Sequence, residues 1–321
     1  MTTNLEADFA ARVDPLRSEL LAHCYRMLGS VHDAEDLLQE TLLRAWRAFG
    51  RYDEGRASLR TWLYRIATNA CLTALEQRSR RPLPSGIGAP GDDPAEPLVP
   101  GEVPWLQPFP DTLAGDPAGA ALARGSLRLA LAAALQLLPA RQRAVFILRE
   151  VLDWPAAEVA QALDTSAVAV NSALQRARAT LGAADLGEDQ LTEPDDPVRR
   201  QYVERYVTAF EHADIDALTS LLTADAVLEM PPFINWYRGR AAYGGFISRV
   251  WRQHGTDWRM IPAGGANGQP VVVAYLRGQD GRHHIHTLQV LAVTPAGISR
   301  NTTYPDSATF ALFGLASELP G

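Results

Sequence analysis

One run near the amino terminus has the apolar spacing of a single amphipathic helix: Asp33-Ala34-Glu35-Asp36-Leu37-Leu38-Gln39-Glu40-Thr41-Leu42-Leu43-Arg44-Ala45-Trp46. Leu38, Leu42 and Ala45 share one face of this helix, because residues three or four positions apart lie side by side. A second face is acidic and carries one apolar side chain; it consists of Asp36, Gln39, Glu40 and Leu43. Most acidic helix faces are simply solvated, but this combination also suits docking onto a basic helix of another protein.

A second run combines a loop, several arginines and several aromatic residues: Tyr52-Asp53-Glu54-Gly55-Arg56-Ala57-Ser58-Leu59-Arg60-Thr61-Trp62-Leu63-Tyr64-Arg65-Ile66-Ala67-Thr68-Asn69. Arg65 and Asn69 are four residues apart and so share a helix face. Basic groups hold phosphates, and aromatic rings stack on unpaired bases. The run is therefore typical of a protein that binds single-stranded nucleic acid. The alternative is that Trp62 and Tyr64 are core aromatics, and we expect Trp62 to be one.

Residues 33–40 and 59–71 together resemble region two of the sigma-70 family, in its extracytoplasmic-function group. The resemblance implies that the acidic helix docks on the clamp helices of the RNA polymerase β′ subunit. The residues implied in that contact are Asp33, Asp36, Gln39, Glu40, Leu43 and Trp46. It also implies that the loop at residues 52–59 captures a flipped base of the minus-ten promoter element. The residues implied in minus-ten binding are Tyr52, Arg56, Ser58, Arg60, Arg65 and Asn69.

A helix-turn-helix is predicted in the second helical segment, residues 118–182. A helix begins near Pro139, a short second helix covers residues 158–163, and a third covers residues 167–181 after the turn Asp164-Thr165-Ser166. The segment resembles sigma region four, which reads the minus-thirty-five element and docks on the polymerase β flap. The residues implied in DNA contact are Thr165, Ser166, Asn171, Ser172, Gln175, Arg176 and Arg178.

The helix-turn-helix departs from its relatives at three positions. Asp164 replaces the usual turn glycine, although Asp tolerates the left-handed conformation better than most residues. Asn171 and Ala173 stand where relatives often carry basic residues. These departures bear on the strength of the phosphate contacts and on the base sequence that the helix reads.

The third segment, residues 198–321, changes character. A helix at residues 199–212 precedes strand-like runs at residues 271–276 and 287–293. Residues 206–218, 221–232, 236–239 and 267–270 resemble the SnoaL-like polyketide-cyclase branch of the nuclear-transport-factor-two-like fold. That resemblance implies a cone of helices on a curved sheet, enclosing a pocket. The candidate pocket residues are Asp225, Met230, Trp236, Tyr237, Tyr275, His284, His286, Asn301 and Tyr304.

Enzymes of this superfamily use an Asp or a His in the pocket for proton transfer. The sequence assigns no acid–base pair, and fold alone does not imply chemistry, so we expect no catalytic residue and no enzyme. His284 and His286 would alternate onto one face of a strand, where a metal pair is conceivable. No third ligand is evident, so we expect neither a metal nor another cofactor.

Charge and linker composition suggest how the segments work together. The net charge of -7 argues against a protein that simply coats nucleic acid, and every basic residue is Arg. Residues 51–81 contain seven arginines, whereas residues 85–120 contain six acids and no base. This acidic Pro/Gly linker, residues 82–117, is compatible with an intramolecular cover of the basic surface. Its apolar part resembles the linker of sigma factors that carry the third domain. The linker residues of interest are Trp105, Leu106, Phe109 and Asp111.

The predicted fold is two all-α domains, residues 9–81 and 118–182, followed by an α+β cone at 198–321, with linkers at 82–117 and 183–197. The predicted function is that of a sigma factor that directs core RNA polymerase to promoters, modulated in cis by the third domain and a small ligand in it. The alternatives are a cyclase- or isomerase-type enzyme fused to DNA-binding domains, and a one-component transcriptional regulator.

No apolar run approaches a membrane span, and Cys24 and Cys71 lie in apolar helical phases. We therefore expect buried thiols and a soluble, cytoplasmic protein.

Overall fold

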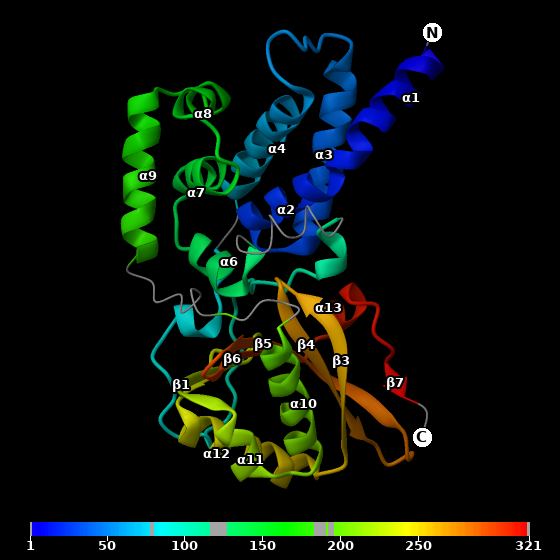
Figure 1. The fold of residues 1–321 in the computed structure, drawn as a ribbon, viewed down its shortest axis with the longest axis vertical. Helices are drawn as coiled ribbons and strands as arrows, with labels where there is room; N and C mark the ends of the chain where they lie inside the picture. Colours follow the sequence, from blue (N-terminus) through cyan, green and yellow to red (C-terminus); the bar gives the residue numbers. More distant parts are fainter. Residues whose placement is uncertain (1, 78–79, 116–126, 183–190, 192–195, 320–321) are drawn as a thin grey trace. The chain divides into compact units, whose positions relative to one another are not determined.

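The computed structural model describes residues 2–77, 80–115, 127–182, 191 and 196–319, with side chains from residue 7 onward. The chain forms two compact units (Figure 1): the described parts of residues 1–81 and 112–186, and those of residues 82–111 and 187–321. Most of the predicted first linker thus belongs to the same unit as the third segment. The predicted boundary at residue 118 and most of the second linker lie outside the described residues. No described helix has the length and apolar character that a membrane crossing needs.

Helices in the first unit begin and end at the residues that cap them. Its amino-terminal part consists of α1 (Thr2–Val13), the short η1 (Asp14–Leu16), α2 (Arg17–Leu28), α3 (Val31–Phe49) and α4 (Leu59–Leu75). Gly29 ends α2 in the left-handed conformation at φ 70°, and the Ser30 side chain accepts a hydrogen bond from Asp33 N at the start of α3. Ser58 caps α4 in the same way. Cys24 and Cys71 are free and buried, as predicted.

The rest of the first unit contains the predicted helix-turn-helix. Its elements are η3 (Asp111–Leu113), α6 (Leu129–Leu135), α7 (Ala140–Phe146), the π-helix η4 (Ile147–Val151), α8 (Ala156–Ala162) and α9 (Ala167–Gly182). Asp164 adopts φ 50° between α8 and α9, which confirms the predicted left-handed turn. Val170, Leu174 and Ala177 are buried and form the face of α9 that packs against the core.

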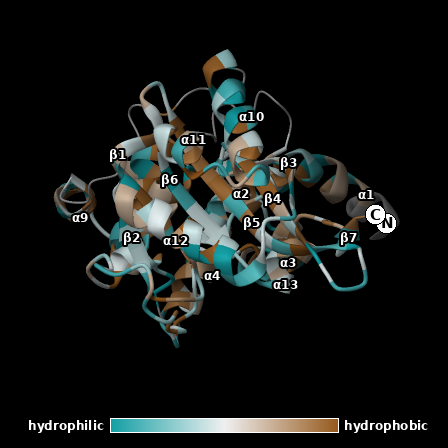
Figure 2. Ribbon diagram, turned by 90° about the horizontal axis from the view of Figure 1, so that it is seen from below, coloured by the Kyte–Doolittle hydropathy of each residue, from teal (hydrophilic) through white to brown (hydrophobic). Residues whose placement is uncertain are grey.

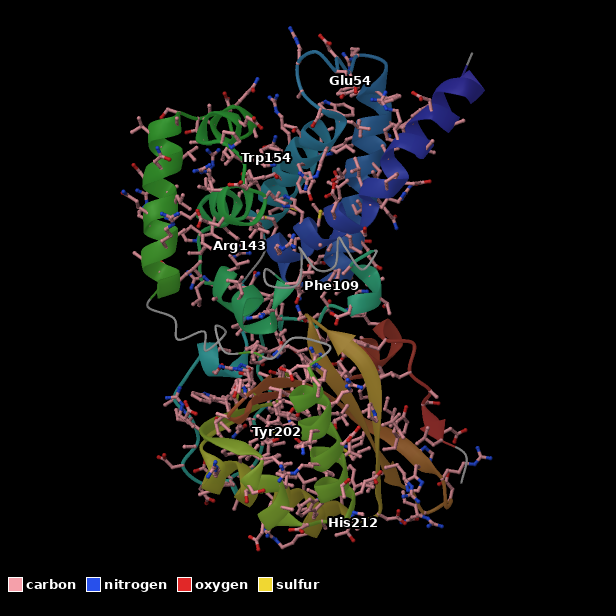
Figure 3. The ribbon with its side chains drawn as sticks, viewed as in Figure 1. Glu54, Phe109, Arg143, Trp154, Tyr202 and His212 are labelled. Atoms are coloured by element: carbon pink, nitrogen blue, oxygen red, sulfur yellow. The ribbon has the colours of Figure 1, made fainter. Side chains whose placement is uncertain are left out.

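Within this unit, α7 and the loop after η4 pack on the amino-terminal helices. The buried Arg143 guanidinium donates to the Met27 carbonyl and, at 2.7 Å, to Gln136 Oε1. Burial lowers the pKa of Arg143 to about 10, so it stays charged at neutral pH. The Trp154 ring lies 6.0 Å from the Tyr64 ring of α4 (Figure 3 labels Arg143 and Trp154).

Helices and a curved sheet build the second unit. The helical elements are η2 (Pro84–Gly86), α10 (Pro197–Glu211), α11 (Ile215–Ser220), α12 (Arg240–His254) and α13 (Ser307–Leu312). The strands are β1 (Leu222–Glu229), β2 (Trp236–Arg238), β3 (Trp258–Ala266), β4 (Gln269–Arg277), β5 (His283–Thr294), β6 (Gly297–Tyr304) and β7 (Glu318–Leu319). The sheet order is β2-β1-β6-β5-β4-β3, with β7 beside β5. Among the strand pairs of the described residues, only β1–β6 is parallel.

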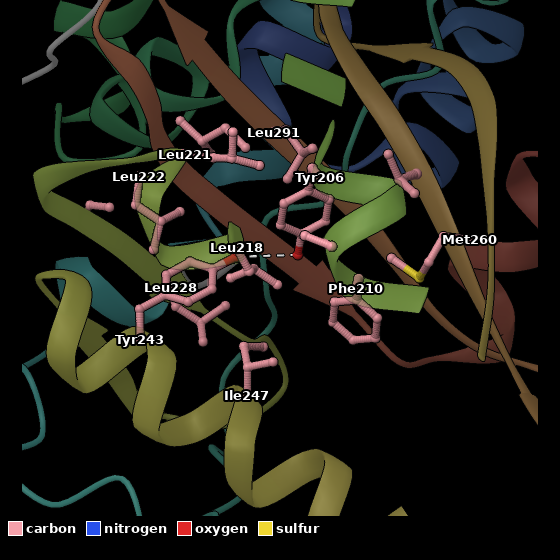
Figure 4. Close-up of a cluster of buried hydrophobic side chains, with 14 of the residues drawn as sticks. Tyr206, Phe210, Leu218, Leu221, Leu222, Leu228, Tyr243, Ile247, Met260 and Leu291 are labelled. Carbon is pink, nitrogen blue, oxygen red and sulfur yellow. Dashed lines mark hydrogen bonds between the residues drawn. The ribbon is translucent and has the colours of Figure 1, made fainter. Parts of the chain in front are cut away.

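One face of the sheet carries the core of this unit. Brown and teal segments alternate along α10 in Figure 2, as expected for a helix with one buried and one exposed face. Tyr206 and Phe210 of α10 pack with Tyr243 and Ile247 of α12 over the strands (Figure 4). The β3–β4 hairpin turns at Asn267-Gly268, where both residues have positive φ, the conformation that this dipeptide favours.

Candidate functional site

The acidic face of α3 is open to solvent. Asp36, Gln39 and Glu40 are exposed, and Leu43 keeps 49% of its surface exposed despite its apolar side chain. The remaining two predicted docking residues are held by the fold. Asp33 forms an ion pair with Arg81 at 2.7 Å, and the half-buried Trp46 ring lies 5.4 Å from the Phe9 ring. Leu38 is only half-buried, and the neighbouring Leu37 lies deeper in the core.

The loop before α4 is closed by its own residues. The Tyr52 hydroxyl donates to the Ala57 carbonyl at 2.9 Å, and the Tyr52 ring lies 5.0 Å from the half-buried Trp62. Arg56 and Ser58 at the loop are exposed. This arrangement leaves the loop tip accessible while its base is fixed.

Two of the three predicted α4 contacts face solvent together. Arg65 and Asn69 are both exposed on one side of the helix. Arg60 differs, because its Nε lies 3.0 Å from both carboxylate oxygens of Glu19 and its guanidinium lies over the Tyr64 ring. Arg60 therefore helps to hold α4 against α2, and a DNA contact would have to compete with that ion pair.

A groove of about 840 Å³ joins this loop to the helix-turn-helix within the first unit. Three arginines line one part of it, and Glu158 and Gln161 of α8 line another. The lining residues are Arg51, Tyr52, Asp53, Arg56, Ala57, Ser58, Thr61, Trp62, Arg65, Glu158, Gln161 and Ala162. The structure thus brings the predicted minus-ten loop and α8 to one site, a juxtaposition that the sequence did not indicate.

The predicted minus-thirty-five residues lie on the outer face of α9 and in the turn before it. Those that are exposed are Thr165 and Ser166 of the turn and Asn171, Gln175, Arg176 and Arg178 of α9. Ser172 is half-buried, and Arg178 forms an ion pair with Glu150 at 2.8 Å. Val168, which the sequence interpretation left out, keeps 76% of its surface exposed beside them. An exposed apolar side chain at the start of such a helix can contact a thymine methyl group.

The second unit encloses a cavity of about 130 Å³. Its apolar lining is Leu98, Phe210, Leu228, Met230, Phe233, Phe246, Ile247, Val250, Trp258 and Pro305. Its polar lining is Arg249, Gln253, His254, His286, Thr287, Gln289, Asn301 and Thr303. Met230, His286 and Asn301 are the predicted pocket residues that line it. The described lining includes no carboxylate.

Six predicted pocket residues lie elsewhere. Asp225 is exposed and accepts a hydrogen bond from Thr223. Trp236 and Tyr275 donate to the carbonyls of Gly88 and Ala316. Tyr237, His284 and Tyr304 also lie outside the lining. Sequence pattern places these residues on strands, but the pairing of distant strands decides which face encloses the cavity.

His284 and His286 do not share a face, which corrects the expected alternation. Ala274 pairs with Thr287 and Tyr275 with Ile285, so His286 is the extra residue of a bulge. His286 lies in the cavity lining, 5.3 Å between ring centroids from His254. His284 Nε2 instead donates to the Asp280 carboxylate at 2.9 Å, on the surface. Asp280, His284 and Glu318 have ligand atoms within 4.8 Å of one another, but all three are exposed.

A buried hydrogen-bond network lies at the inner end of the cavity. Tyr206 donates to Gln289 Oε1 at 2.8 Å, and Asn301 Nδ2 donates to the Tyr243 hydroxyl at 2.8 Å. Burial raises the pKa of Tyr243 to about 12 and raises the pKa of Tyr206 well above its usual value, so both stay protonated. Burial, and secondarily His254, lowers the pKa of His286 to about 4, so this imidazole is neutral at physiological pH. The inner end of the cavity is therefore polar but uncharged.

The linker is hydrogen-bonded along one side of the second unit. Ser85 donates from its hydroxyl at 2.7 Å and from its backbone N at 3.2 Å to Glu229, a fully buried carboxylate. Arg300 donates to the other oxygen of Glu229 at 2.7 Å. The buried carboxylate thus accepts hydrogen bonds from Arg300, from the linker and, at 3.1 Å, from the Thr302 hydroxyl, as burial requires.

Further along, the linker forms a strand-like contact with the loop before β2. Val99 N donates to Asn235 Oδ1 at 2.6 Å, and its carbonyl accepts from Ile234 N at 2.9 Å. Gly101 N donates to the Pro232 carbonyl at 2.8 Å. These are contacts of the backbone, which have no signature in the sequence.

The end of the linker docks on the β3–β4 turn. Phe109 N donates to Asn267 Oδ1 and its carbonyl accepts from Asn267 N, each at 2.8 Å. Asp111 Oδ1 accepts from Gly268 N at 2.8 Å. Leu106 and Phe109 are fully buried, and Trp105 is half-buried. The predicted anchor residues therefore lie in the docked part of the linker.

Comparisons with known proteins agree with this architecture. The family model of Sigma-70 region 2 matches residues 13–81, that of Sigma-70, region 4 matches residues 128–181, and that of the SnoaL-like domain matches residues 203–298. The chain is 50% identical over 317 residues to the ECF RNA polymerase sigma factor SigG of Mycobacterium tuberculosis, covering 97% of this chain and 85% of that protein. It is 30% identical to SigJ of the same organism, covering 75% of this chain and 73% of that protein.

The crystal structure of the M. tuberculosis extracytoplasmic function sigma factor SigJ matches with a TM-score of 0.65 at 25% identity, covering 97% of this chain and 99% of that one. Two sigma-70 regions ahead of a SnoaL-like domain define a promoter-directing subunit of RNA polymerase. The chain belongs to the family of ECF RNA polymerase sigma factors. It accordingly binds core RNA polymerase and promoter DNA, and the enzyme and one-component alternatives are not favoured.

Proposed function

We propose that the SnoaL-like domain regulates this sigma factor in cis, by holding the linker that connects region two to region four. The observation that supports this proposal is the set of hydrogen bonds between residues 82–111 of the linker and the SnoaL-like domain. The polymerase contacts are assigned to the β′ clamp helices for α3 and to the β flap for region four, with the loop at residues 52–59 on the minus-ten element and α9 on the minus-thirty-five element. These contacts belong to the cytoplasm, where bacterial RNA polymerase works.

Chain length shows why a docked linker matters. The two promoter elements are, as their names state, about 25 base pairs apart, or roughly 85 Å of duplex at 3.4 Å per base pair. Leu106 N donates to the Pro82 carbonyl, so residues 82–106 form a closed loop that adds almost nothing to the reach of the tether. At about 3.3–3.6 Å per extended residue, residues 106–127 reach roughly 75 Å, whereas residues 82–127 reach roughly 150 Å. The docked linker therefore restricts the separation of the two regions.

Run-off transcription with core polymerase tests the proposal. Asn267→Gly keeps a residue that accepts positive φ but removes the amide that holds Phe109, leaving a buried N–H unsatisfied at a cost of about 1–3 kcal/mol. Asn235→Ala removes the contact to Val99. Both variants are expected to raise transcription from a promoter with both elements. Arg259→Gln, at an exposed position of β3, is the matched control.

Deleting residues 198–321 should likewise change transcription, and Trp105→Ala should partly reproduce that change. The proposal fails if the Asn267 and Asn235 variants, the deletion and the wild type all give the same transcription and the same affinity for core polymerase.

A further inference from the structure

The lining of the cavity in the SnoaL-like domain changes from apolar in the interior to polar at the mouth. Phe246, Met230 and Trp258 are buried in its interior, whereas Gln253 and His254 at the end of α12 are exposed and so mark its mouth. Leu98 of the linker is part of the wall and packs against the core of the domain. One wall of the cavity is therefore present only while the linker is docked.

The size and lining limit what can enter. An apolar cavity of roughly 150 Å³ accommodates a benzene-sized molecule, and this one measures about 130 Å³. A single six-membered ring fits the apolar interior, and its polar substituent would face the mouth. The described lining holds no carboxylate to repel an anion, and Arg249 is its permanent cation.

Arg249 also holds the linker. Its Nη1 donates to the carbonyls of Pro94, at 2.9 Å, and Glu96. A guanidinium has five N–H groups in a fixed fork, so three others remain for a second acceptor. A carboxylate at the mouth would thus share Arg249 with the linker, and the guanidinium would connect ligand and linker.

We propose that this cavity binds a small monocyclic carboxylic acid, with its ring against Phe246 and Trp258 and its carboxylate on Arg249, and that the bound acid stabilises the docked linker. This rests on the proposed regulation by the linker and names the ligand class of that regulation. The ligand should favour the docked linker because the complete binding site exists only in that state. When the linker undocks, the cavity loses Leu98 from its wall, and Arg249 loses the two carbonyls that orient it. By reciprocity, a ligand that binds the docked state more tightly favours that state.

Benzoate is the probe, with benzyl alcohol as its uncharged analogue, titrated into the full-length protein by calorimetry. Benzoate is expected to bind at one site and more tightly than the alcohol. Arg249→Gln should lower that preference about tenfold or more, because a charge-assisted hydrogen bond is lost. Leu98→Ala should weaken both probes equally, whereas Val99→Ala, whose side chain is exposed, should affect neither. Retained binding of the alcohol shows that the Arg249 variant is folded.

Hydrogen exchange tests the coupling. Saturating benzoate should slow exchange at Val99 N and Gly101 N, while Gly29 N of the first unit, which donates to the Tyr25 carbonyl at 2.7 Å, serves as the internal reference. Faster exchange at Val99 and Gly101 would show that benzoate releases the linker rather than stabilising its docked state. Absence of saturable binding of both probes at millimolar concentration would overturn the ligand class. The Asn267→Gly transcription test needs no ligand. If only the ligand proposal is wrong, this variant still raises transcription; if the regulatory proposal is wrong, it does not.

Discussion

His23 is a buried titratable side chain in the core of region two. Its Nε2 lies 2.9 Å from the Thr68 hydroxyl, and its ring packs edge-on against Tyr64 at 5.0 Å. Burial, and secondarily the charges of Arg26 and Arg60, lowers the pKa of His23 from 6.5 to about 3. Folded region two therefore holds a neutral imidazole across the whole physiological range, whereas the unfolded chain protonates it below pH 6.5.

This pKa predicts a loss of stability in acid. The unfolded state binds the proton and the folded state does not, so stability falls as pH drops from 6.5 towards 3. Between about pH 7.5 and pH 5.5, His23 alone should cost roughly 1.3 kcal/mol. Urea unfolding at both pH values measures the loss in the wild type and in His23→Gln, which retains a group able to bond Thr68. Equal losses in the two proteins would show that His23 does not titrate as stated.

Arg65 and Asn69 should differ in how they bind promoter DNA. Asn69→Ala is expected to lose a base-specific contact of about 1–3 kcal/mol at the minus-ten element. Arg65→Ala should instead weaken binding to all sequences evenly and reduce the salt dependence by about one unit of slope. Binding of holoenzyme to matched and mutated promoters over a salt series measures both. Arg47→Ala, an exposed arginine on α3, is the control. Normal promoter opening by both variants would show that the face is misassigned.

At the scale of single elements, charge reversal on α3 tests the proposed contact of this helix with the polymerase. Asp36 is exposed beside Leu43, so Asp36→Arg alters the face and leaves the packing of α3 intact. The variant is expected to bind core polymerase at least about tenfold more weakly, since like charges across an interface repel. Glu204→Arg makes the same charge change at an exposed position of α10 and should bind normally. Unchanged affinity of a folded Asp36 variant would contradict the assignment.

Local elements were predictable where their signals are local. The apolar period predicted α3 and α9 within a few residues of their observed bounds, and Asp164 marked the turn between α8 and α9. Such features depend on neighbours in the chain, which a single sequence contains.

The cavity was predictable only in part, because its residues come from distant elements. Gln289 and Leu228 line it through the pairing of β1, β5 and β6, and Arg249 and His254 reach it from α12. A bulge at His286 broke the expected alternation. Apolar residues recurring along α12 were a usable signal for one wall, whereas the backbone contacts of the linker gave none.

At the scale of the first unit, regions two and four form one packed body. Trp154 packs against Tyr64, Arg143 binds the Met27 carbonyl, and α8 shares a groove with the loop at residues 52–59. In this arrangement the exposed Arg65 lines the groove that α8 also lines. Contact with promoter elements roughly 85 Å apart requires the two regions to separate.

Labels on the two regions should therefore move apart when the protein binds core polymerase and promoter DNA. Cysteines introduced at the exposed Arg47 of α3 and Thr180 of α9 can be spin-labelled selectively, because the native Cys24 and Cys71 are buried. Their separation is expected to increase by tens of ångströms, as the spacing of the elements demands. A label pair at Arg47 and Arg17, both on helices of region two, should keep its separation.

Adding Asn267→Gly should favour the long distance at lower polymerase concentration, because a released linker no longer restrains region four. An unchanged distance between Arg47 and Thr180 in the transcribing complex would mean that the packed arrangement is itself active, and that the linker controls something other than the separation of the two regions.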